Sequence, residues 1–406
     1  MFLVGVYQSW WKSPFFRHNR LLKTQKDVDV LLKSDIKEVM IDPSRGLDVH
    51  EETEKPSSTL PSSAQTPIGD VLQDEEVCSA SSVPSPQDVS IQIKHDAVTA
   101  IERVFEGVKT GAVIDHPTLR HTMQALVKQV FSQEQVMAEL YVLENLHAFD
   151  KTLYDHVVDV AILSIMVGLQ LGVNERDLEV LALGGLLHDV GHVRIPRNVL
   201  KRKHELGEHE RVIFERHVGR GLAILEQCPS ISSEVQRVVA EHHERQDGSG
   251  YPFQRAHREI SPLSDIVGFI DQLDACVSPW GPPPGLPMAL AVRQLYMYAK
   301  EGQLRVEPVA ALIRCLGVYP LGSLVRLSTG EQAVVVKTNP LERLKPTVKL
   351  ISDQNGRVYD SPIIENLAAS NTSTPQRMIE DILNPANLHI DVQQYVSHDP
   401  RHESHV

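Results

Sequence analysis

The chain has 406 residues, of which 42% are apolar and 23% charged, as is ordinary for a globular protein long enough for two or three domains. Its formal net charge of −13 argues against a general nucleic-acid binder, which needs a basic face, so we expect no DNA partner. The four cysteines form no C-x-x-C pair, which favours free thiols in a reducing compartment.

The apolar segments do not predict a membrane partner. The start, MFLVGVYQSWWKSPFF, lacks the basic region and long apolar stretch of a signal peptide. The most apolar later run, VVDVAILSIMVGLQLG, is interrupted by Asp159 and is too short to span a bilayer. We therefore expect a cytoplasmic protein.

The first 90 residues predict a small domain followed by a linker. In residues 1–49, MFLVGVYQ is typical of a strand, TQKDVDVLLKSDI of a short helix and KEVMIDPSRG of a strand that closes on a turn, which together make an α/β unit. Residues 50–90 hold five prolines, nine serines, eight acidic residues against one lysine, and no aromatic residue. Such a stretch buries too little apolar surface to offset its ordering entropy, so we expect a disordered acidic linker, with phosphorylation sites as a further role.

Residues 91–318 predict an all-α bundle, because apolar residues recur there at three- and four-residue spacing. The helical segments are 116–146, 155–172, 176–189, 208–227, 232–243, 262–277 and 286–301. Residues 319–368 change character, since GSLVRLSTGEQAVVVKTN and PTVKLISDQNGRVYD each contain β-rich runs around a Thr-Gly or Asn-Gly turn. The expected fold is thus mainly α, with a β-rich extension over 319–368 and a polar tail over 369–406.

Histidine and aspartate side chains recur within or beside the apolar helices. They are His156, His188, Asp189, His217, His242, His243 and Asp271. Taken singly, each has a structural explanation: a histidine hydrogen-bonded in the core, Asp189 closing a helix, or Asp271 paired with an arginine. Together they require many partners, because an unsatisfied buried polar group costs roughly 1–3 kcal/mol. One or two divalent cations would satisfy all of them, and imidazole with carboxylate suits Fe, Mn, Zn or Ni.

These residues stand in motifs that resemble the HD superfamily of metal-dependent phosphohydrolases and, within it, the HD-GYP branch. The motifs are HDVGHVRIP (188–196), HV..G (217–221), HHERQDGSGYP (242–252) and D..DA (271–275), with His156 upstream at a matching distance. The resemblance covers residues 147–318, and the segments on either side resemble domains that often flank HD-GYP domains. It implies an HD-type helical bundle and a bacterial phosphodiesterase that hydrolyses cyclic di-GMP to the linear dinucleotide, sometimes on to GMP.

The resemblance also implies two divalent metal ions, with Fe or Mn first and Zn or Ni as alternatives. It assigns one metal to His156, His188, Asp189 and Asp271. It assigns the other to Asp189, as a bridge, with His217, His242 and His243. A metal-bridging hydroxide would attack phosphorus in line, with Asp189 and His192 as catalytic residues. The residues expected beside the substrate are Gly248, Gly250, Tyr251 and Trp280. Some family members bind a third metal through a Glu at the place that Thr152 occupies here, so we expect two.

Three departures from the family pattern fall on the substrate side. His192 replaces the lysine of H-D-x-G-K, where it either donates a hydrogen bond or is simply exposed after the helix end. The turn SPWGPPPG (278–285) replaces an Arg-Pro-Tyr clamp, and Trp280 in it either stacks on guanine or packs locally. Asp265 stands where an arginine is usual.

These departures leave two classes of function open. The first is a cyclic di-GMP phosphodiesterase of reduced or altered activity, with hydrolysis of another nucleotide as a variant. The second is a catalytically degenerate HD-GYP module that binds metal and nucleotide or protein partners as a signalling adaptor. Family habit adds a homodimer to the expected partners.

Overall fold

The computed structural model describes residues 84–147, 151–201, 206–278, 285–369 and 377–396, and three short N-terminal strands by their backbone. The chain divides into two units, Met1–Ser81 and Ser82–Val406. In the first, β1 (Phe2–Val6) pairs antiparallel with β2 (Arg20–Leu21) and β3 (Val39–Ile41). β1 and β3 lie in the two segments predicted as strands, whereas the predicted helix between them and most of the predicted linker lie outside the described residues.

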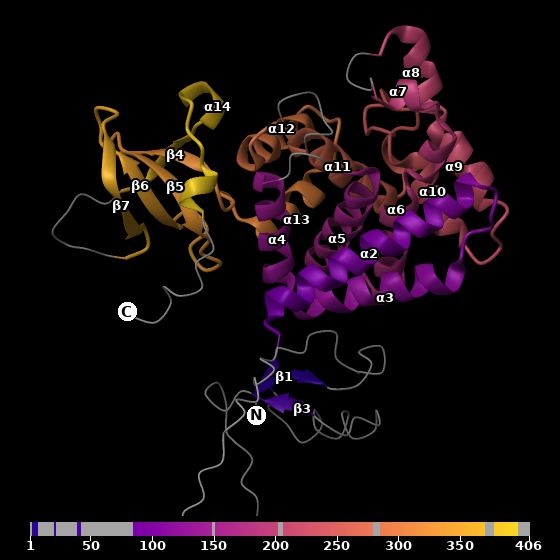
Figure 1. Ribbon diagram of the computed structural model, residues 1–406, viewed down its shortest axis with the longest axis horizontal. Coiled ribbons are helices and arrows are strands. Elements are labelled where there is room, and N and C mark those ends of the chain that lie inside the picture. The colour runs from indigo at the N-terminus through magenta and orange to yellow at the C-terminus, as the bar shows by residue number, and fades with distance from the viewer. Residues whose placement is uncertain are drawn as a thin grey trace, which may run out of the picture. The chain divides into compact units, whose positions relative to one another are not determined.

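The second unit begins with a helical bundle (Figure 1). Its helices are α2 (Pro86–Lys109), α3 (His116–Ser132), α4 (Glu134–His147), α5 (Leu153–Leu171), α6 (Glu175–Leu187), α7 (Arg197–Lys201), α8 (Glu208–Glu215), α9 (His217–Leu225), α10 (Ser233–Glu241), α11 (Pro262–Val277), α12 (Met288–Lys300) and α13 (Val306–Leu316). Short 3-10 turns, η3 (Val190–Arg194) and η4 (His257–Glu259), join some of them. The mainly α prediction is confirmed.

α5 is the central helix, and it packs against α6, α11, α13, α2 and α3. Its start is fixed by Thr152, which forms a capping box with Asp155, and its end by Gly172 in the left-handed conformation at φ 74°. This helix has 19 residues, so the prediction that its apolar run is too short for a bilayer is wrong on length alone. However, 72% of its apolar window is buried within the protein, as in the core helix of a bundle.

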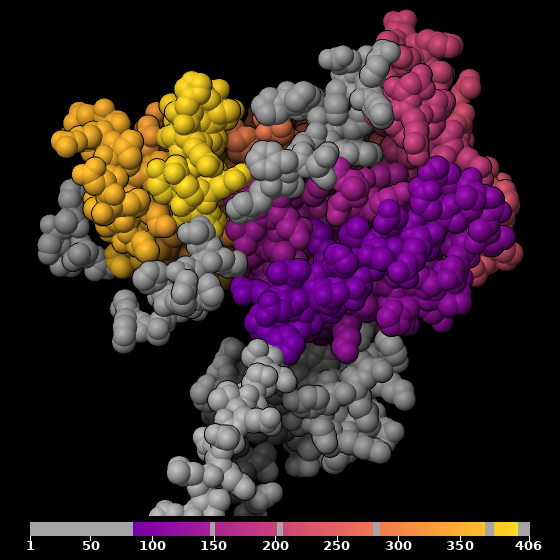
Figure 2. All heavy atoms as spheres, in the orientation of Figure 1, coloured from indigo at the N-terminus to yellow at the C-terminus, as the bar shows by residue number. Residues whose placement is uncertain are grey.

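α2 begins earlier than the sequence pattern indicated. Its first residue, Pro86, lies within the segment 50–90 that we predicted to be a disordered linker, so the predicted boundary is wrong by five residues. Ser85 caps the helix, and its side chain and that of Asp88 satisfy each other's backbone amides. Ser85 and Pro86, which contributed to the Ser- and Pro-rich composition that suggested a linker, instead form the N-terminus of a helix. The space-filling view shows α2, in indigo, across the visible face of the bundle (Figure 2).

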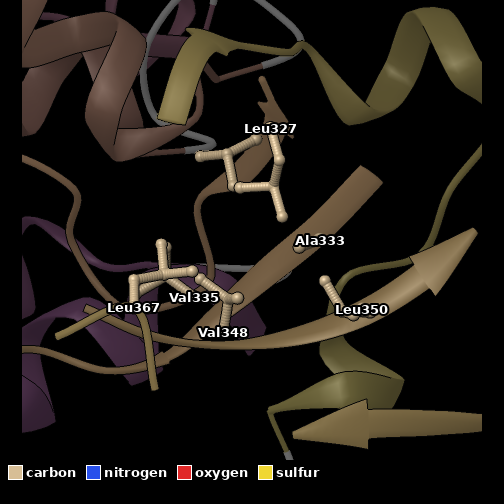
Figure 3. Close-up of a cluster of buried hydrophobic side chains, with 7 residues drawn as sticks. Leu327, Ala333, Val335, Val348, Leu350 and Leu367 are labelled. Atoms are coloured by element: carbon tan, nitrogen blue, oxygen red, sulfur yellow. The ribbon is translucent and has the colours of Figure 1, made fainter. Parts of the chain in front are cut away.

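A β-rich extension follows the bundle, as predicted. It is a five-stranded antiparallel sheet in the order β7-β6-β5-β4-β8. The strands are β4 (Leu324–Leu327), β5 (Gln332–Lys337), β6 (Thr347–Ser352), β7 (Val358–Asn366) and β8 (Ile379–Ile382). Alternate residues of the inner strands point into a small apolar core that includes Leu327, Val335, Val348 and Leu350 (Figure 3).

The polar tail predicted for residues 369–406 is wrong for its described part. β8 pairs with β4, and the short helices α14 (Pro385–Leu388) and η5 (Gln393–Tyr395) follow it. Val392 and Val396 are buried in a second cluster, against which Leu143 and Leu146 of α4 pack. Single apolar residues separated by polar ones supply this core, so average composition concealed it.

Candidate metal centre

Four helix ends and one helix interior bring the seven predicted ligands together. His156 lies in the first turn of α5, and His188 and Asp189 lie between α6 and η3. His217 is the first residue of α9, and His242 and His243 follow directly on α10. Asp271 lies in the middle of α11. Because the helix is ending at His242, the two adjacent histidines both reach the centre, which they would not do within a regular helix.

The Asp189 carboxylate lies between two groups of imidazoles. Its Oδ1 is 3.4 Å from His217 Nε2 and 3.7 Å from His242 Nε2. Its Oδ2 is 3.7 Å from His156 Nε2 and 3.6 Å from His188 Nε2. Each oxygen of one side chain therefore faces a different pair of nitrogens, which is the arrangement of a bridging carboxylate.

The donor atoms form two clusters, within each of which they all lie within 4.8 Å of one another. One cluster is His156, His188 and Asp271, and the other is Asp189, His217, His242 and His243. In the first, His156 Nε2 is 3.2 Å from Asp271 Oδ1, and in the second His243 Nε2 is 3.2 Å from His217 Nε2. These separations are those expected of ligands that share a cation at about 2.1 Å.

The imidazole rings are held so that Nε2 is directed inward. Nδ1 of His188, His217 and His242 hydrogen-bonds the carbonyl three residues earlier, that of Gly185, Phe214 and Val239 respectively, at 2.8–2.9 Å. Nδ1 of His156 instead contacts Asp274 Oδ2 at 2.7 Å. Protein metal sites fix the ring and tautomer of a ligating histidine in this way, which leaves the other nitrogen with a free lone pair.

The charge state of the histidines also fits a cation. His188 Nε2 is buried and has no hydrogen-bond partner among the described residues, so that only an ion or a solvent molecule would satisfy it. Burial lowers the pKa of His188 and His243 and lowers that of His217 to about 4. These three imidazoles are therefore neutral near pH 7, as a ligand must be.

The carboxylates are ionised in spite of their burial. Although burial favours the protonated form of Asp189, the neighbouring imidazole of His192 holds its pKa well below the ordinary value. Burial likewise opposes ionisation of Asp271, but the hydrogen bond from His156 keeps its pKa low. Burial also opposes protonation of His156, yet the bonds to Asp271 and Asp274 raise its pKa to about 10.

His192 is buried rather than exposed, so the alternative that it simply faces solvent is wrong. Its residue is 3% accessible, and its ring packs against those of Phe214 and His217, with centroids 5.1 and 4.3 Å away. Its Nδ1 lies 3.6 Å from Asp189 Oδ2. The replacement of the family lysine thus places an imidazole directly beside the bridging carboxylate.

The loop after the histidine pair folds back onto it. A Cβ on Gly250 would lie 2.5 Å from the His243 carbonyl oxygen and from Glu244 Cα, so only glycine permits this approach. Tyr251 donates its backbone N–H to that carbonyl and stacks on the His243 ring with centroids 4.5 Å apart. Gly248 has φ 77°, in the left-handed region. Tyr251 thus lies against a histidine of the candidate centre, and the two glycines allow the loop to take this conformation.

The departure at Asp265 has a structural outcome that differs from a simple change of charge. Asp265 is buried, and it forms an ion pair with Arg305 at 3.3 Å and accepts a hydrogen bond from Gln246 at 3.0 Å. Its negative charge is therefore compensated within the protein. Trp280 and the turn around it lie outside the described residues.

Sequence reasoning gave no role to four charged residues behind the centre, one of which, Asp274, stands in the D..DA motif. Asp274 contacts the predicted ligand His156, and Lys151 contacts Asp274 at 3.0 Å. Asp159 and Lys94 continue the same ion-pair network, and all four are buried. The sequence signal was a charged residue three positions after a ligand within an apolar helix, as in His156 to Asp159 and Asp271 to Asp274.

We expect the metal-free protein to lose stability as the pH falls from 7.5 to 5. The unfolded chain protonates histidine near pH 6.5, whereas folded His217 resists protonation down to about 4, so the unfolded state gains protons first. This effect amounts to about 2 kcal/mol at pH 5 for His217 alone, and His188 and His243 act in the same direction. His156, with its raised pKa, opposes the loss by a smaller amount of about 1 kcal/mol.

Urea unfolding in excess chelator at the two pH values measures this difference. The His217→Gln variant is the control, since it removes one of the titrating groups and should show a shallower dependence. Equal or greater stability at pH 5 would contradict the prediction.

Comparison with protein families gives matches along most of the chain. Residues 134–304 match the family described as HD domain, residues 1–118 a domain of unknown function (DUF3391), and residues 324–389 the KOW domain associated with HD domain. The two outer matches coincide with the N-terminal unit together with α2, and with the β extension. The helical bundle and its histidine and aspartate centre thus define an HD domain protein.

Curated relatives narrow the assignment. A cyclic di-GMP phosphodiesterase of Pseudomonas aeruginosa is 30% identical over 88% of this chain and 84% of its own length. The cyclic di-GMP phosphodiesterase response regulator RpfG of Xanthomonas campestris is 34% identical over 37% of this chain and 39% of its own. A 3'3'-cGAMP-specific phosphodiesterase of Vibrio cholerae is 32% identical over 30% of this chain and 23% of its own. The chain belongs to the HD-GYP family of HD domain proteins, which confirms the resemblance seen in its motifs.

Proposed function

We propose that the protein is a metal-dependent phosphodiesterase that hydrolyses cyclic di-GMP to the linear dinucleotide. The observation that carries the proposal is the Asp189 carboxylate, whose two oxygens face two separate clusters of nitrogen donors. A structural metal needs one closed set of ligands, whereas two adjacent sites that share a carboxylate suit in-line attack on a phosphodiester. The substrate follows from the curated relative that matches most of the chain.

The proposal includes two divalent cations, Fe or Mn first. His156, His188, Asp271 and Asp189 Oδ2 would hold one, and His217, His242, His243 and Asp189 Oδ1 the other. When bound, such cations lower the pKa of water and neutralise charge on the phosphodiester in the transition state. The protein's own contribution is to fix the rings of His188, His217 and His242 through their Nδ1 bonds. Burial also keeps His188, His217 and His243 neutral by lowering the pKa of each.

The substrate would approach from the side of His243 and Asp271. Their side chains are 16% and 11% accessible, whereas those of His188, His217 and His242 are fully buried. Tyr251, stacked on His243, lies on this side. Burial raises the pKa of Tyr251 well above its usual value, so its hydroxyl remains a neutral hydrogen-bond donor for a phosphate oxygen.

His192 would act beside the Asp189 carboxylate. Its ring nitrogen lies near the carboxylate that both clusters share, where family members place an ammonium group. An imidazole is shorter than a lysine side chain and, unlike an ammonium group, is not permanently charged at neutral pH, so we expect slower turnover than with lysine. A cytoplasmic location is part of the proposal, because the three described cysteines are free thiols, as is usual in a reducing compartment: Cys228, Cys276 and Cys315.

The proposal is tested by turnover of cyclic di-GMP with protein loaded with Fe or Mn. The His188→Ala/Asp189→Ala double variant, which lacks ligands of both clusters, sets the background, and 3'3'-cGAMP is the second substrate. We expect turnover above background, with a preference for cyclic di-GMP, and a faster reaction in His192→Lys.

The result that would overturn the proposal is specific. If the protein carries close to two metals per chain and yet hydrolyses neither dinucleotide above background, the function is that of a metal-binding adaptor. If only 3'3'-cGAMP is hydrolysed, the class of enzyme stands and the substrate is wrong. Recovery of cyclic di-GMP turnover in His192→Lys alone would identify the lost lysine as the reason for inactivity.

A further inference from the structure

A chain of alternating charges runs from α2 to the metal centre. Lys94 of α2 forms ion pairs with Glu144 of α4 and with Asp159 of α5. Asp159 also pairs with Lys151, which in turn contacts Asp274 Oδ1 at 3.0 Å. We call Lys94, Asp159, Lys151 and Asp274 the buried ion chain.

The last member of the buried ion chain contacts a predicted metal ligand. Asp274 Oδ2 lies 2.7 Å from His156 Nδ1, while Nε2 of the same ring faces Asp271 and Asp189. Asp274 is fully buried and also accepts a hydrogen bond from Tyr141 at 3.0 Å. His156 thus has a carboxylate at hydrogen-bonding distance from Nδ1, where His188, His217 and His242 have carbonyls. Nδ1 of the remaining histidine, His243, lies farther, at 3.6 Å, from a carboxylate oxygen of Asp271.

The two inner members of the buried ion chain each contact two residues of opposite charge. Asp159 divides its charge between two lysines, and Lys151 divides its charge between two aspartates. All four are buried, where ionic interactions are strong and an uncompensated charge is costly, so loss of one member must be met by movement of the next. Without Lys94, Lys151 would be the one lysine paired with Asp159 and would move away from Asp274. Asp274 is the residue that orients His156.

α2 also reaches the other side of the centre. Arg194 of η3, the turn that carries His192, donates to the Val108 carbonyl at the end of α2 at 3.0 Å. The family match to the N-terminal domain runs to residue 118 and so includes α2, although α2 packs within the bundle against α3 and α5. The first helix after the N-terminal unit is thus built into the support of both sides of the centre.

We propose that Lys94 is a positioning residue of the metal centre, which acts through Asp159, Lys151 and Asp274 to hold His156 in its ligating orientation. This inference rests on the proposed function insofar as His156 is a metal ligand. A merely structural ion pair would stabilise the bundle without favouring one cluster over the other.

The test measures Mn²⁺ binding to the metal-free full chain by calorimetry in two backgrounds. His217→Ala leaves the cluster of His156, His188 and Asp271 as the better site, and His188→Ala leaves the cluster around His217 and His243. We expect Lys94→Met to weaken Mn²⁺ binding at least about fivefold in the first background and less than about twofold in the second, because loss of outer support typically weakens a metal site by 10–100-fold.

Two further variants separate positioning from folding. Lys128→Met, the same change at an exposed position of α3, is the matched control and should alter neither affinity. Lys94→Met/Asp159→Asn removes two opposite charges and leaves Lys151 to Asp274, so it should recover affinity to within about threefold of the parent.

The outcomes distinguish this inference from the proposed function. Equal weakening in both backgrounds, no weakening in the first, or no recovery in the double variant overturns the positioning role, while the metal centre stands. A wild-type chain that binds no Mn²⁺ at all overturns both.

Discussion

Replacing Asp189 by alanine should remove both metals and abolish phosphodiesterase activity. One carboxylate faces both clusters, with Oδ1 towards His217 and His242 and Oδ2 towards His156 and His188. Its loss therefore deprives each site of an anionic ligand and leaves Asp271 as the one carboxylate among the predicted ligands of two cations. We expect turnover to fall by at least about 10³-fold, which corresponds to about 4 kcal/mol of transition-state stabilisation.

Metal analysis distinguishes this effect from damage to a single site. Asp189→Ala should retain close to no metal after dialysis, whereas His217→Ala should retain about one ion per chain, held by the cluster with His156. Asp96→Ala is the matched control, since that carboxylate is 68% accessible on the surface of α2. One retained metal in Asp189→Ala would show that the two clusters do not share this ligand.

Gly191→Ala should be among the most destabilising single substitutions in the bundle. A Cβ at this position would lie 1.9 Å from the His217 carbonyl oxygen and 2.6 Å from the Gly221 amide nitrogen, both of them backbone atoms. Neither a side-chain rotation nor a local shift relieves such contacts, so η3 must move away from α9. We expect a loss of about 3 kcal/mol in unfolding free energy and loss of metal from the His217 cluster, because this contact brings His217 beside Asp189.

The control for this substitution lies in α9, the helix on which η3 packs. Gly219 has an ordinary helical backbone and nothing within 4 Å of an added Cβ. Gly219→Ala should therefore be neutral or should stabilise the protein by up to about 1 kcal/mol, because alanine is the better helix former. Chemical unfolding with and without Mn²⁺ measures both variants, and similar stability for the two would contradict the close packing of η3 on α9.

The fold and the histidine and aspartate residues that gather at the candidate centre were predictable because their signals are local and repeated. The helix over 262–277 was predicted at the residues where α11 begins and ends, since Ser261 caps it and apolar spacing fills it. The segment 208–227 was predicted as one helix but is two, α8 and α9, which meet at Arg216. Periodicity does not reveal this break, because apolar residues continue across it.

The support of the centre was not predictable from spacing. Lys94 and Asp159 lie 65 positions apart in the sequence and become neighbours only through the packing of α2 on α5. Likewise, nothing in the sequence indicates that His192 turns inward against Phe214 rather than towards solvent. Long-range pairing of isolated charged residues depends on tertiary structure, whereas the residue types and spacing of a ligand motif already indicate metal binding.

The burial of Val392 and Val396 against α4 has a consequence for how the protein is made. The cluster that holds them joins residues about 250 positions apart, so the β extension and α4 cannot acquire their final packing until synthesis is nearly complete. An expression vector that stops at residue 368, where the β-rich pattern ends, would lack β8 and these valines. It would leave the β4 edge unpaired and remove part of the apolar cluster that covers Leu143 and Leu146. We expect the shortened protein to aggregate after its release from the ribosome rather than fold as a trimmed enzyme.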